Sequence, residues 1–78
     1  MNDEPMSFGE KAVGLTFNPS GDPTVRKLKG LYAEIIDICD AARKNGTGNE
    51  QKRLFSVAIT EAQGAQMWAV KAATWRDG

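Results

Sequence analysis

The sequence contains no histidine and only one cysteine among its 78 residues. Without histidine, the chain lacks the usual proton shuttle at neutral pH and the Ser-His and Cys-His nucleophile arrangements. A lone thiol has no partner for a disulfide within the chain, and one thiol without imidazole cannot complete a tetrahedral zinc site. These absences argue against catalysis by the common hydrolytic routes, so we expect a protein that is not an enzyme and needs no cofactor.

Net charge and long apolar runs are also missing. Ten Lys plus Arg balance ten Asp plus Glu, so the chain lacks the broad positive field with which proteins bind polymeric nucleic acid. No apolar run approaches the roughly 20 residues that cross a bilayer, and the N-terminus lacks the basic and apolar regions of a signal peptide. We expect a cytoplasmic protein that binds neither membranes nor polymeric nucleic acid. A small anionic ligand would need only a few cations.

The length of the chain limits its stability. A single domain of this size buries only about 60% of the surface that its unfolded chain exposes. Disulfides and zinc are excluded as stabilising links, which leaves oligomerisation. Within the single domain we expect an N-terminal arm, residues 1–21, and a helical hairpin domain, residues 22–78.

The arm carries the signals of one short helix followed by an extended segment. Ser7 and Glu10 have the spacing of a capping box, which predicts a helix over about 7–13, ended by Gly14. The following residues predict an extended stretch that enters a turn, because Pro19 disfavours helical geometry in the residue before it.

Two long helices account for the rest of the chain. Asp22 and Pro23 form a helix start, with an acceptor side chain at the N-cap and a proline at the first position. The first helix is predicted over about 22–44 and the second from 49 or 50 to about 75. The break between them, residues 45–49, is rich in residues that accept left-handed geometry. So short a loop makes the two helices antiparallel.

Apolar residues repeat at helical spacing on more than one face of each helix. On the first helix they form a seam and a widening group: Val25, Leu28, Tyr32, Ile35, Cys39 and Ala42, then Leu31, Ile36 and Ile38. On the second helix two neighbouring seams are Leu54, Ala58, Ala65, Trp68, Ala72 and Trp75, then Phe55, Ile59, Ala62, Ala69 and Ala73. One hairpin contact cannot cover all of these residues. We therefore predict an all-α antiparallel helical hairpin, with a short N-terminal helix and an extended arm, that assembles as a homo-oligomer.

Three cations open the first long helix, namely Arg26, Lys27 and Lys29. The start of a helix disfavours cations and favours anions, so their placement needs a reason. The turn formed by Phe17, Asn18 and Pro19 must lie close by, because it ends shortly before that helix begins.

These residues support two interpretations. In one, they form a pocket for a phosphorylated base, with the base stacked on Phe17 and the phosphate on Lys29 and Arg26. In the other, Phe17 plugs the end of the hairpin and the cations form a solvated face.

Three further features stand out on the long helices. Gly64 interrupts the second helix, where glycine costs about 1 kcal/mol relative to alanine. It either lets another helix approach or makes room for a ligand beside Trp68 and Lys71. Trp68 and Trp75 form a stripe that fits a core or an interface, and Cys39 fits a small buried hydrophobe better than a nucleophile.

Several short segments together resemble a known family. They are Gly14 to Pro23, the basic helix start leading to Ala33-Glu34-Ile35-Ile36-Asp37, Ala58-Ile59-Thr60-Glu61, and Met67-Trp68-Ala69-Val70-Lys71-Ala72. In order and spacing they resemble the hairpin domain shared by phage anti-CBASS protein 2 and Thoeris anti-defence protein 1, over about residues 12–75.

The resemblance implies a function. Members of that family are phage-encoded sponges, which bind the cyclic nucleotide messengers of bacterial immune systems without cleaving them. They are small helical hairpins assembled into homo-hexamers, with cyclic dinucleotides held between protomers and, in several members, cyclic trinucleotides in separate pockets. The resemblance thus implies sequestration of cyclic oligonucleotides such as cyclic GMP-AMP inside the infected host.

Carried over by position, the family's stacking aromatic falls on Phe17, its neighbouring polar contact on Asn18 beside Pro19, and its phosphate-binding lysine on Lys29, with Arg26 and Lys27 close by. The trinucleotide pocket falls near Trp68, with Lys71 or Arg76 as the cation. The extra strands of the Thoeris-directed members are missing, which favours the anti-CBASS type. The alternatives are a sponge for cyclic ADP-ribose isomers and a hairpin that binds a protein partner or itself without a small ligand.

Overall fold

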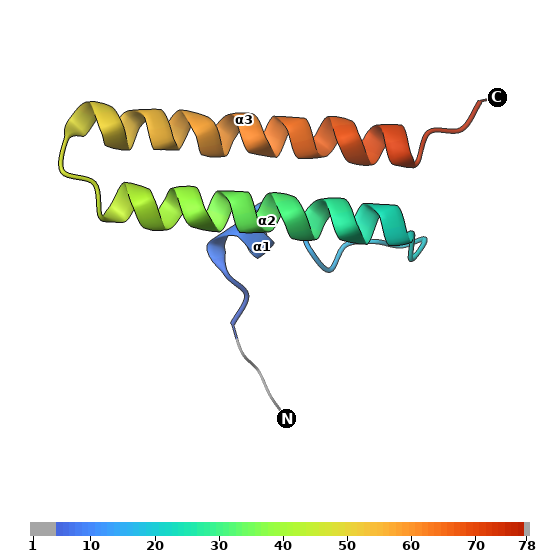
Figure 1. The fold of residues 1–78 in the computed structure, drawn as a ribbon. Coiled ribbons are helices and arrows are strands. Elements are labelled where there is room, and N and C mark those ends of the chain that lie inside the picture. The colour runs from blue at the N-terminus through green and yellow to red at the C-terminus, as the bar shows by residue number, and fades with distance from the viewer. Residues whose placement is uncertain (1–4, 78) are drawn as a thin grey trace.

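The computed structural model describes residues 5–77, which contain three helices and no strand. They are α1 (Phe8–Val13), α2 (Pro23–Lys44) and α3 (Asn49–Ala73). The two long helices lie side by side and antiparallel, and α1 packs beneath them (Figure 1). The predicted all-α hairpin with a short N-terminal helix is confirmed.

The helix starts follow from their capping residues. The Ser7 hydroxyl accepts a hydrogen bond from the Glu10 backbone N–H at 3.1 Å, and the Glu10 carboxylate accepts one from the Ser7 N–H at 2.9 Å. Gly14 ends α1 in the left-handed conformation, with φ 63°. At the start of α2, the Asp22 carboxylate accepts hydrogen bonds from the N–H groups of the second and third helical residues. The predicted boundaries of α1 and α2 are therefore confirmed.

The second long helix ends slightly before its predicted end. It stops at Ala73, and Thr74 forms the C-cap, so Trp75 lies outside the helix. The Thr74 hydroxyl donates to the carbonyl oxygen of Val70 at 2.9 Å. This contact occupies a carbonyl oxygen of the last turn, as expected where a helix ends.

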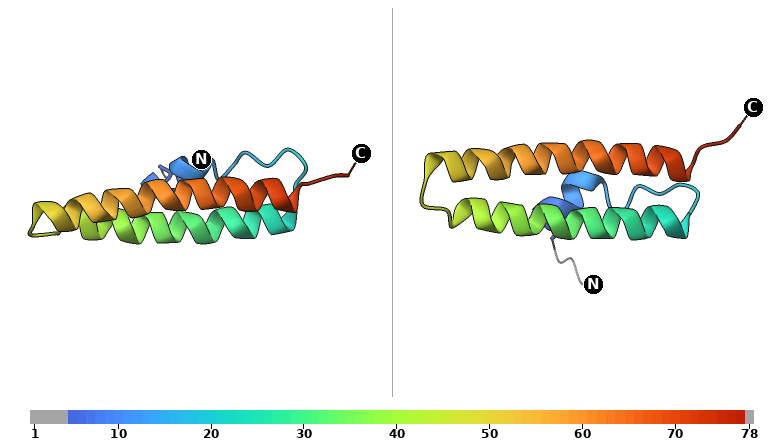
Figure 2. Two further views of the ribbon diagram at one scale, coloured as in Figure 1. Left: turned by 90° about the horizontal axis from the view of Figure 1, so that it is seen from above. Right: turned by 45° about the horizontal axis from the view of Figure 1, so that its top comes forward.

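The short helix α1 packs against α2 through Gly9. The Gly9 backbone N–H donates to Asp37 Oδ1 at 2.7 Å, and a Cβ at this position would collide with the carbonyl oxygen of Ala33. Glycine is thus required for the close approach. The arm continues from α1 over the same face of the α2–α3 layer (Figure 2).

The core is small and lies where the three helices meet. Val13, Ala33, Ile36 and Ile59 are its buried members, and Cys39 packs against them half-buried. The predicted seam of α2 is wrong in its register, because Ile35 is 48% exposed. The buried row of α2 is instead Val25, Lys29, Ala33, Ile36 and Asp40. The shift has a physical cause: α2 packs against both α1 and α3, which turns its buried face away from the two-helix seam.

Much apolar surface stays uncovered in the single chain. The first seam predicted for the second long helix is exposed at every position, with Trp68 72% and Trp75, just beyond α3, 64% exposed. On α2 the exposed apolar residues are Leu31, Ile35 and Ile38. The second predicted seam of α3, which includes Ile59, faces the interior. None of the helices in residues 5–77 has the length and hydropathy needed to cross a membrane.

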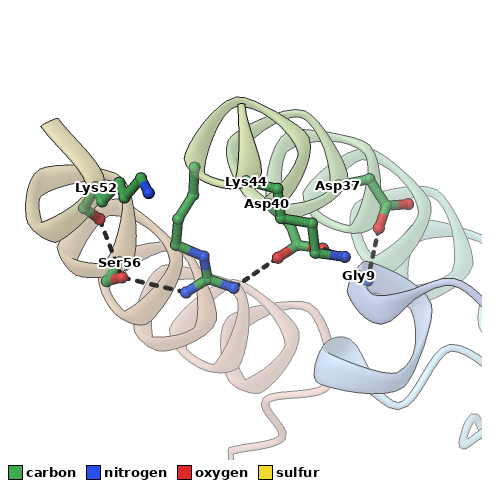
Figure 3. A network of polar contacts seen from close by, with 7 residues as sticks. Gly9, Asp37, Asp40, Lys44, Lys52 and Ser56 are labelled. Atoms are coloured by element: carbon green, nitrogen blue, oxygen red, sulfur yellow. Dashed lines mark hydrogen bonds and ion pairs between the residues drawn. The ribbon is translucent and has the colours of Figure 1, made fainter. Parts of the chain in front are cut away.

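A polar network joins the helices at the loop end of the hairpin (Figure 3). Arg43 donates to Asp40 Oδ1 at 2.6 Å and to the Ser56 hydroxyl at 3.2 Å, and its guanidinium lies 5.7 Å from the ring of Phe8. The hydrogen bond from Arg43, supported by Lys44, holds the pKa of Asp40 below its ordinary value. One arginine thereby connects all three helices.

Candidate functional site

A pocket of about 280 Å³ lies between the arm, the start of α2 and the end of α3. Its lining residues come from all three segments: Phe17, Asn18, Pro19 and Ser20 from the arm, Val25 and Lys29 from α2, and Val70 with the C-cap residue Thr74 from the end of α3. We call it the arm pocket. Four of the seven residues proposed as ligand-binding from the sequence lie together here.

Lys29 is buried although it carries a charge. The residue is 5% exposed, and its Nζ donates to the carbonyl oxygens of Gly14 at 3.0 Å and Phe17 at 2.5 Å. Among the described residues, none of the ion pairs with a carboxylate includes Lys29. A buried ammonium is costly unless it is hydrogen-bonded, and its three donors exceed the two carbonyl contacts. The positive charge at this pocket is therefore not neutralised by the chain's described residues.

Phe17 stands at the rim of the arm pocket. Its side chain is 71% exposed, so it does not plug the end of the hairpin. The Lys29 Nζ lies 5.4 Å from the centre of its ring. An exposed aromatic face beside a buried cation suits a ligand that combines a flat ring with a negative charge.

Asn18 shapes the turn as well as lining the pocket. Its amide Nδ2 donates to the Asp22 carbonyl oxygen at 3.0 Å, and its Oδ1 accepts from the Asp22 N–H at 3.2 Å. One N–H and one acceptor position of the amide remain for a ligand. Pro19 lies at the tip of the same turn and is exposed. The amide thus holds the arm against the start of α2.

Arg26 and Lys27 are placed differently from Lys29. Both are exposed, and neither lines the arm pocket. Lys27 borders a separate hollow together with Pro23 and Leu31. The structure thus groups only Lys29 with the aromatic turn, whereas the sequence placed the phosphate on Lys29 and Arg26 together.

Val70 and Thr74 complete the arm pocket from α3, and sequence reasoning missed both. They lie one turn apart at the end of the helix, and the Thr74 hydroxyl donates a hydrogen bond to the carbonyl oxygen of Val70. Its oxygen therefore faces a ligand only as an acceptor. The pairing of the two antiparallel helices could have placed Val70 here, because Val25 and Val70 are separated from the loop by similar numbers of residues.

Trp68 and Lys71 lie apart from the arm pocket. The Lys71 Nζ is 5.6 Å from the centre of a Trp68 ring, and both residues line a shallow hollow with Ala72 and Trp75. Trp68 also borders a larger groove of about 690 Å³, which includes Gly64. Among the described residues, a Cβ on Gly64 would meet nothing within 4 Å, so no other part of residues 5–77 packs closely against it.

The described residues form no cluster of three or more His, Cys, Asp or Glu side chains that could hold a metal ion. The arm pocket offers a stacking face, a buried ammonium, an amide and a hydroxyl acceptor. These groups suit the binding of an anionic, ring-containing molecule.

Comparison with known protein families shows which family this chain belongs to. The family model described as the Acb2/Tad1 hairpin domain matches residues 10–74. The chain belongs to the Acb2/Tad1 hairpin family. The matched segment includes every residue that lines the arm pocket, from Phe17 to Thr74. No curated protein and no solved structure matched the chain.

Proposed function

We propose that this protein is a sponge for cyclic oligonucleotide messengers. It binds cyclic dinucleotides such as cyclic GMP-AMP in the arm pocket, sequesters them uncleaved, and so blocks CBASS-type bacterial immunity. One observation carries the proposal: the exposed ring of Phe17 stands beside the buried ammonium of Lys29 in a chain of the Acb2/Tad1 hairpin family.

The ligand class follows from the chemistry of the pocket. A nucleobase stacks on an exposed aromatic ring, which contributes about 1–3 kcal/mol per base. Lys29 forms no ion pair with a carboxylate of residues 5–77, so its charge is available to a phosphate. Hydrogen bonds between charged groups are stronger than those between neutral ones. The amide of Asn18 and the oxygen of Thr74 offer further polar contacts at the edge of the base.

The arm pocket is small and open, which favours a shared site. Its volume of about 280 Å³ lies at the lower end of small-molecule pockets, so a whole cyclic dinucleotide needs walls from a second chain. Trp68 on α3 and Trp75 just after the helix form an exposed stripe. Together with Leu31, Ile35 and Ile38 on α2, it offers apolar surface for self-association. We propose a homo-oligomer, a hexamer in the arrangement of the family, in which protomers complete the pocket together.

Binding without cleavage fits the composition of the chain. Phosphodiester hydrolysis in proteins commonly uses histidine or a bound metal ion, and this sequence has no histidine. The hollow at Trp68 and Lys71 is a second candidate site, for cyclic trinucleotides.

The direct test mixes the purified protein with cyclic GMP-AMP, removes free ligand, and then releases the bound ligand by heat. Recovery of intact cyclic GMP-AMP supports a sponge. A linear or hydrolysed product would make the protein an enzyme. Failure to take up any cyclic di- or trinucleotide or cyclic ADP-ribose isomer would favour a hairpin that only binds proteins, for which the uncovered stripe on α3 is the candidate surface.

A further inference from the structure

Lys29 links two segments that the arm pocket needs in a fixed relation. Its Nζ donates to the carbonyl oxygens of Gly14 and Phe17, at the beginning and the end of the turn that follows α1. The turn has one backbone hydrogen bond across it, from the Phe17 N–H to the Gly14 carbonyl oxygen at 2.9 Å. The ammonium therefore adds two charge-assisted bonds to a turn with few contacts of its own.

Phe17 has few contacts of its own that would hold its ring in one orientation, so the bonds from Lys29 to the turn affect how the ring is presented. Its side chain is largely solvent-exposed, so burial in the chain does not fix the direction of the ring. Two contacts with Lys29 hold Phe17 instead. The Phe17 carbonyl oxygen accepts a hydrogen bond from the Lys29 ammonium, and the Lys29 Nζ lies 5.4 Å from the centre of the Phe17 ring. A ring held in the binding orientation before the ligand arrives loses less conformational entropy on binding.

Gly14 contributes to the same arrangement. It adopts φ 63°, in the left-handed region that favours glycine, and a Cβ there would lie 4.0 Å from the Lys29 Nζ. The backbone thus turns so that its carbonyl oxygen reaches the ammonium. Arg26, one turn earlier on α2, is exposed and makes no side-chain contact of this kind in the described part of the chain.

We propose that Lys29 is a positioning residue for the Phe17 ring, in addition to supplying positive charge to the pocket. Its two bonds to backbone carbonyls hold the turn over residues 14–17 in the conformation that presents the ring. The inference deepens the proposed function and rests on it for the ligand, whereas the conformation of the turn is a property of the free protein.

The first experiment uses the free protein and needs no ligand. Amide hydrogen exchange is measured by NMR on the full chain and on Lys29→Met, which keeps the length and apolar stem of the side chain. Exchange at Leu15 and Phe17 should accelerate by at least about tenfold, because one charge-assisted hydrogen bond accounts for such a factor. Exchange in the middle of α2 and α3 should stay slow, which confirms that the variant folds. Unchanged exchange at the turn would overturn the proposal.

The matched control is Lys27→Met. It removes the same charge from the same helix at an exposed position outside the arm pocket. Exchange at the turn should be unaltered in this variant. Acceleration equal to that of Lys29→Met would show a general effect of charge on α2, and would contradict positioning by the two bonds.

The second experiment separates positioning from charge. Guanosine has a base but no phosphate, and its affinity is measured by chemical-shift titration against both variants. If Lys29 positions the ring, Lys29→Met weakens guanosine binding severalfold or more, and Lys27→Met does not. If Lys29 acts through its charge alone, guanosine binding is unaltered and only the cyclic dinucleotide loses affinity, which would overturn the proposal. If the unaltered protein binds neither ligand, the proposed function fails, and the exchange rates of the free turn decide the positioning role alone.

Discussion

Asn18 and Asp22 are joined by two hydrogen bonds, one from the Asn18 amide to the Asp22 carbonyl oxygen and one from the Asp22 N–H to the Asn18 Oδ1. Asp22 is also the N-cap of α2, since its carboxylate accepts hydrogen bonds from two N–H groups of the first turn. Asn18, which the sequence predicted as a ligand contact, thus has a defined structural role in the free protein.

The first prediction concerns this pair. Asn18→Ala removes both bonds and should lower the free energy of unfolding by about 1–2 kcal/mol, because each net hydrogen bond contributes roughly 1 kcal/mol. Urea denaturation measures the change. Pro19→Ala at the exposed tip of the turn is the control and should have a smaller effect. Equal stability of Asn18→Ala and the unaltered protein would contradict the role of the amide.

The second prediction concerns the packing of α1 on α2. Gly9→Ala places a methyl group against the Ala33 carbonyl oxygen and disturbs the bond to Asp37. The expected loss of stability is about 1–3 kcal/mol, as for other overpacked contacts. Thermal unfolding measures it. A neutral result would mean that α1 does not depend on this close approach.

The third prediction compares two glycines in the long helices. An added Cβ meets nothing within 4 Å at either Gly30 or Gly64, so alanine should stabilise the isolated chain by up to about 1 kcal/mol at both sites. If Gly64 lies in an interface between protomers, Gly64→Ala should also weaken self-association. Sedimentation velocity over a range of concentrations measures this second effect. Unaltered association would place Gly64 outside the interface.

The fourth prediction concerns acid. Arg43 and then Lys44 lower the pKa of Asp40 in the folded protein. A carboxyl group of this kind contributes its full stabilisation above its unfolded pKa, near about 4, and loses it as the pH falls through the lower folded pKa. The unfolding free energy should therefore decrease on acidification below about pH 4. Asp40→Asn should remove that part of the decrease.

The control for the acid experiment is Glu50→Gln. The pKa of Glu50 is also lowered, by its hydrogen bond to Arg53, but this pair is exposed on the surface of α3. Exposed ion pairs contribute little to stability, so the profile should resemble that of the unaltered protein. Identical profiles for Asp40→Asn and the unaltered protein would show that the network in Figure 3 does not stabilise the fold through Asp40.

The fifth prediction separates ligand binding from stability. Because Phe17 is largely exposed, Phe17→Ala should alter the unfolding free energy by less than about 0.5 kcal/mol. Its affinity for cyclic GMP-AMP should fall by about tenfold or more, from the loss of a stacking contact. Calorimetric titration and sedimentation measure binding and assembly side by side. If Phe17→Ala dissociated the oligomer while the unfolding free energy of the chain stayed the same, Phe17 would belong to the interface between protomers.

The local fold could be predicted from the sequence because its signals are local. The capping box at Ser7 and the Asp22-Pro23 start each specify a helix end through side chains within a few residues. The register of the buried face could not be obtained in this way. Lys29 is buried because the carbonyl oxygens of Gly14 and Phe17, in the turn after α1, accept hydrogen bonds from its ammonium. Asp40 is buried with Arg43 and Lys44 of the same helix as its ionic partners. An apolar pattern gives no indication of buried charges.

The arm pocket was predictable in part for the same reason. Phe17, Asn18 and Lys29 are close in sequence to one another, so their proximity follows from the short arm. Val70 and Thr74 come from the far end of α3, and only the pairing of the long helices brings them to the turn. Motifs that are identified within short segments carry no information about how the two long helices pair.

Native mass spectrometry of the protein with cyclic GMP-AMP tests the central claim most directly, because it reports the number of chains and the mass of the bound ligand together. The account predicts an oligomer that carries intact cyclic GMP-AMP, and loss of the ligand with retention of the oligomer in Phe17→Ala. A ligand-free oligomer at saturating cyclic GMP-AMP, or a bound species with the mass of a hydrolysed product, would contradict it.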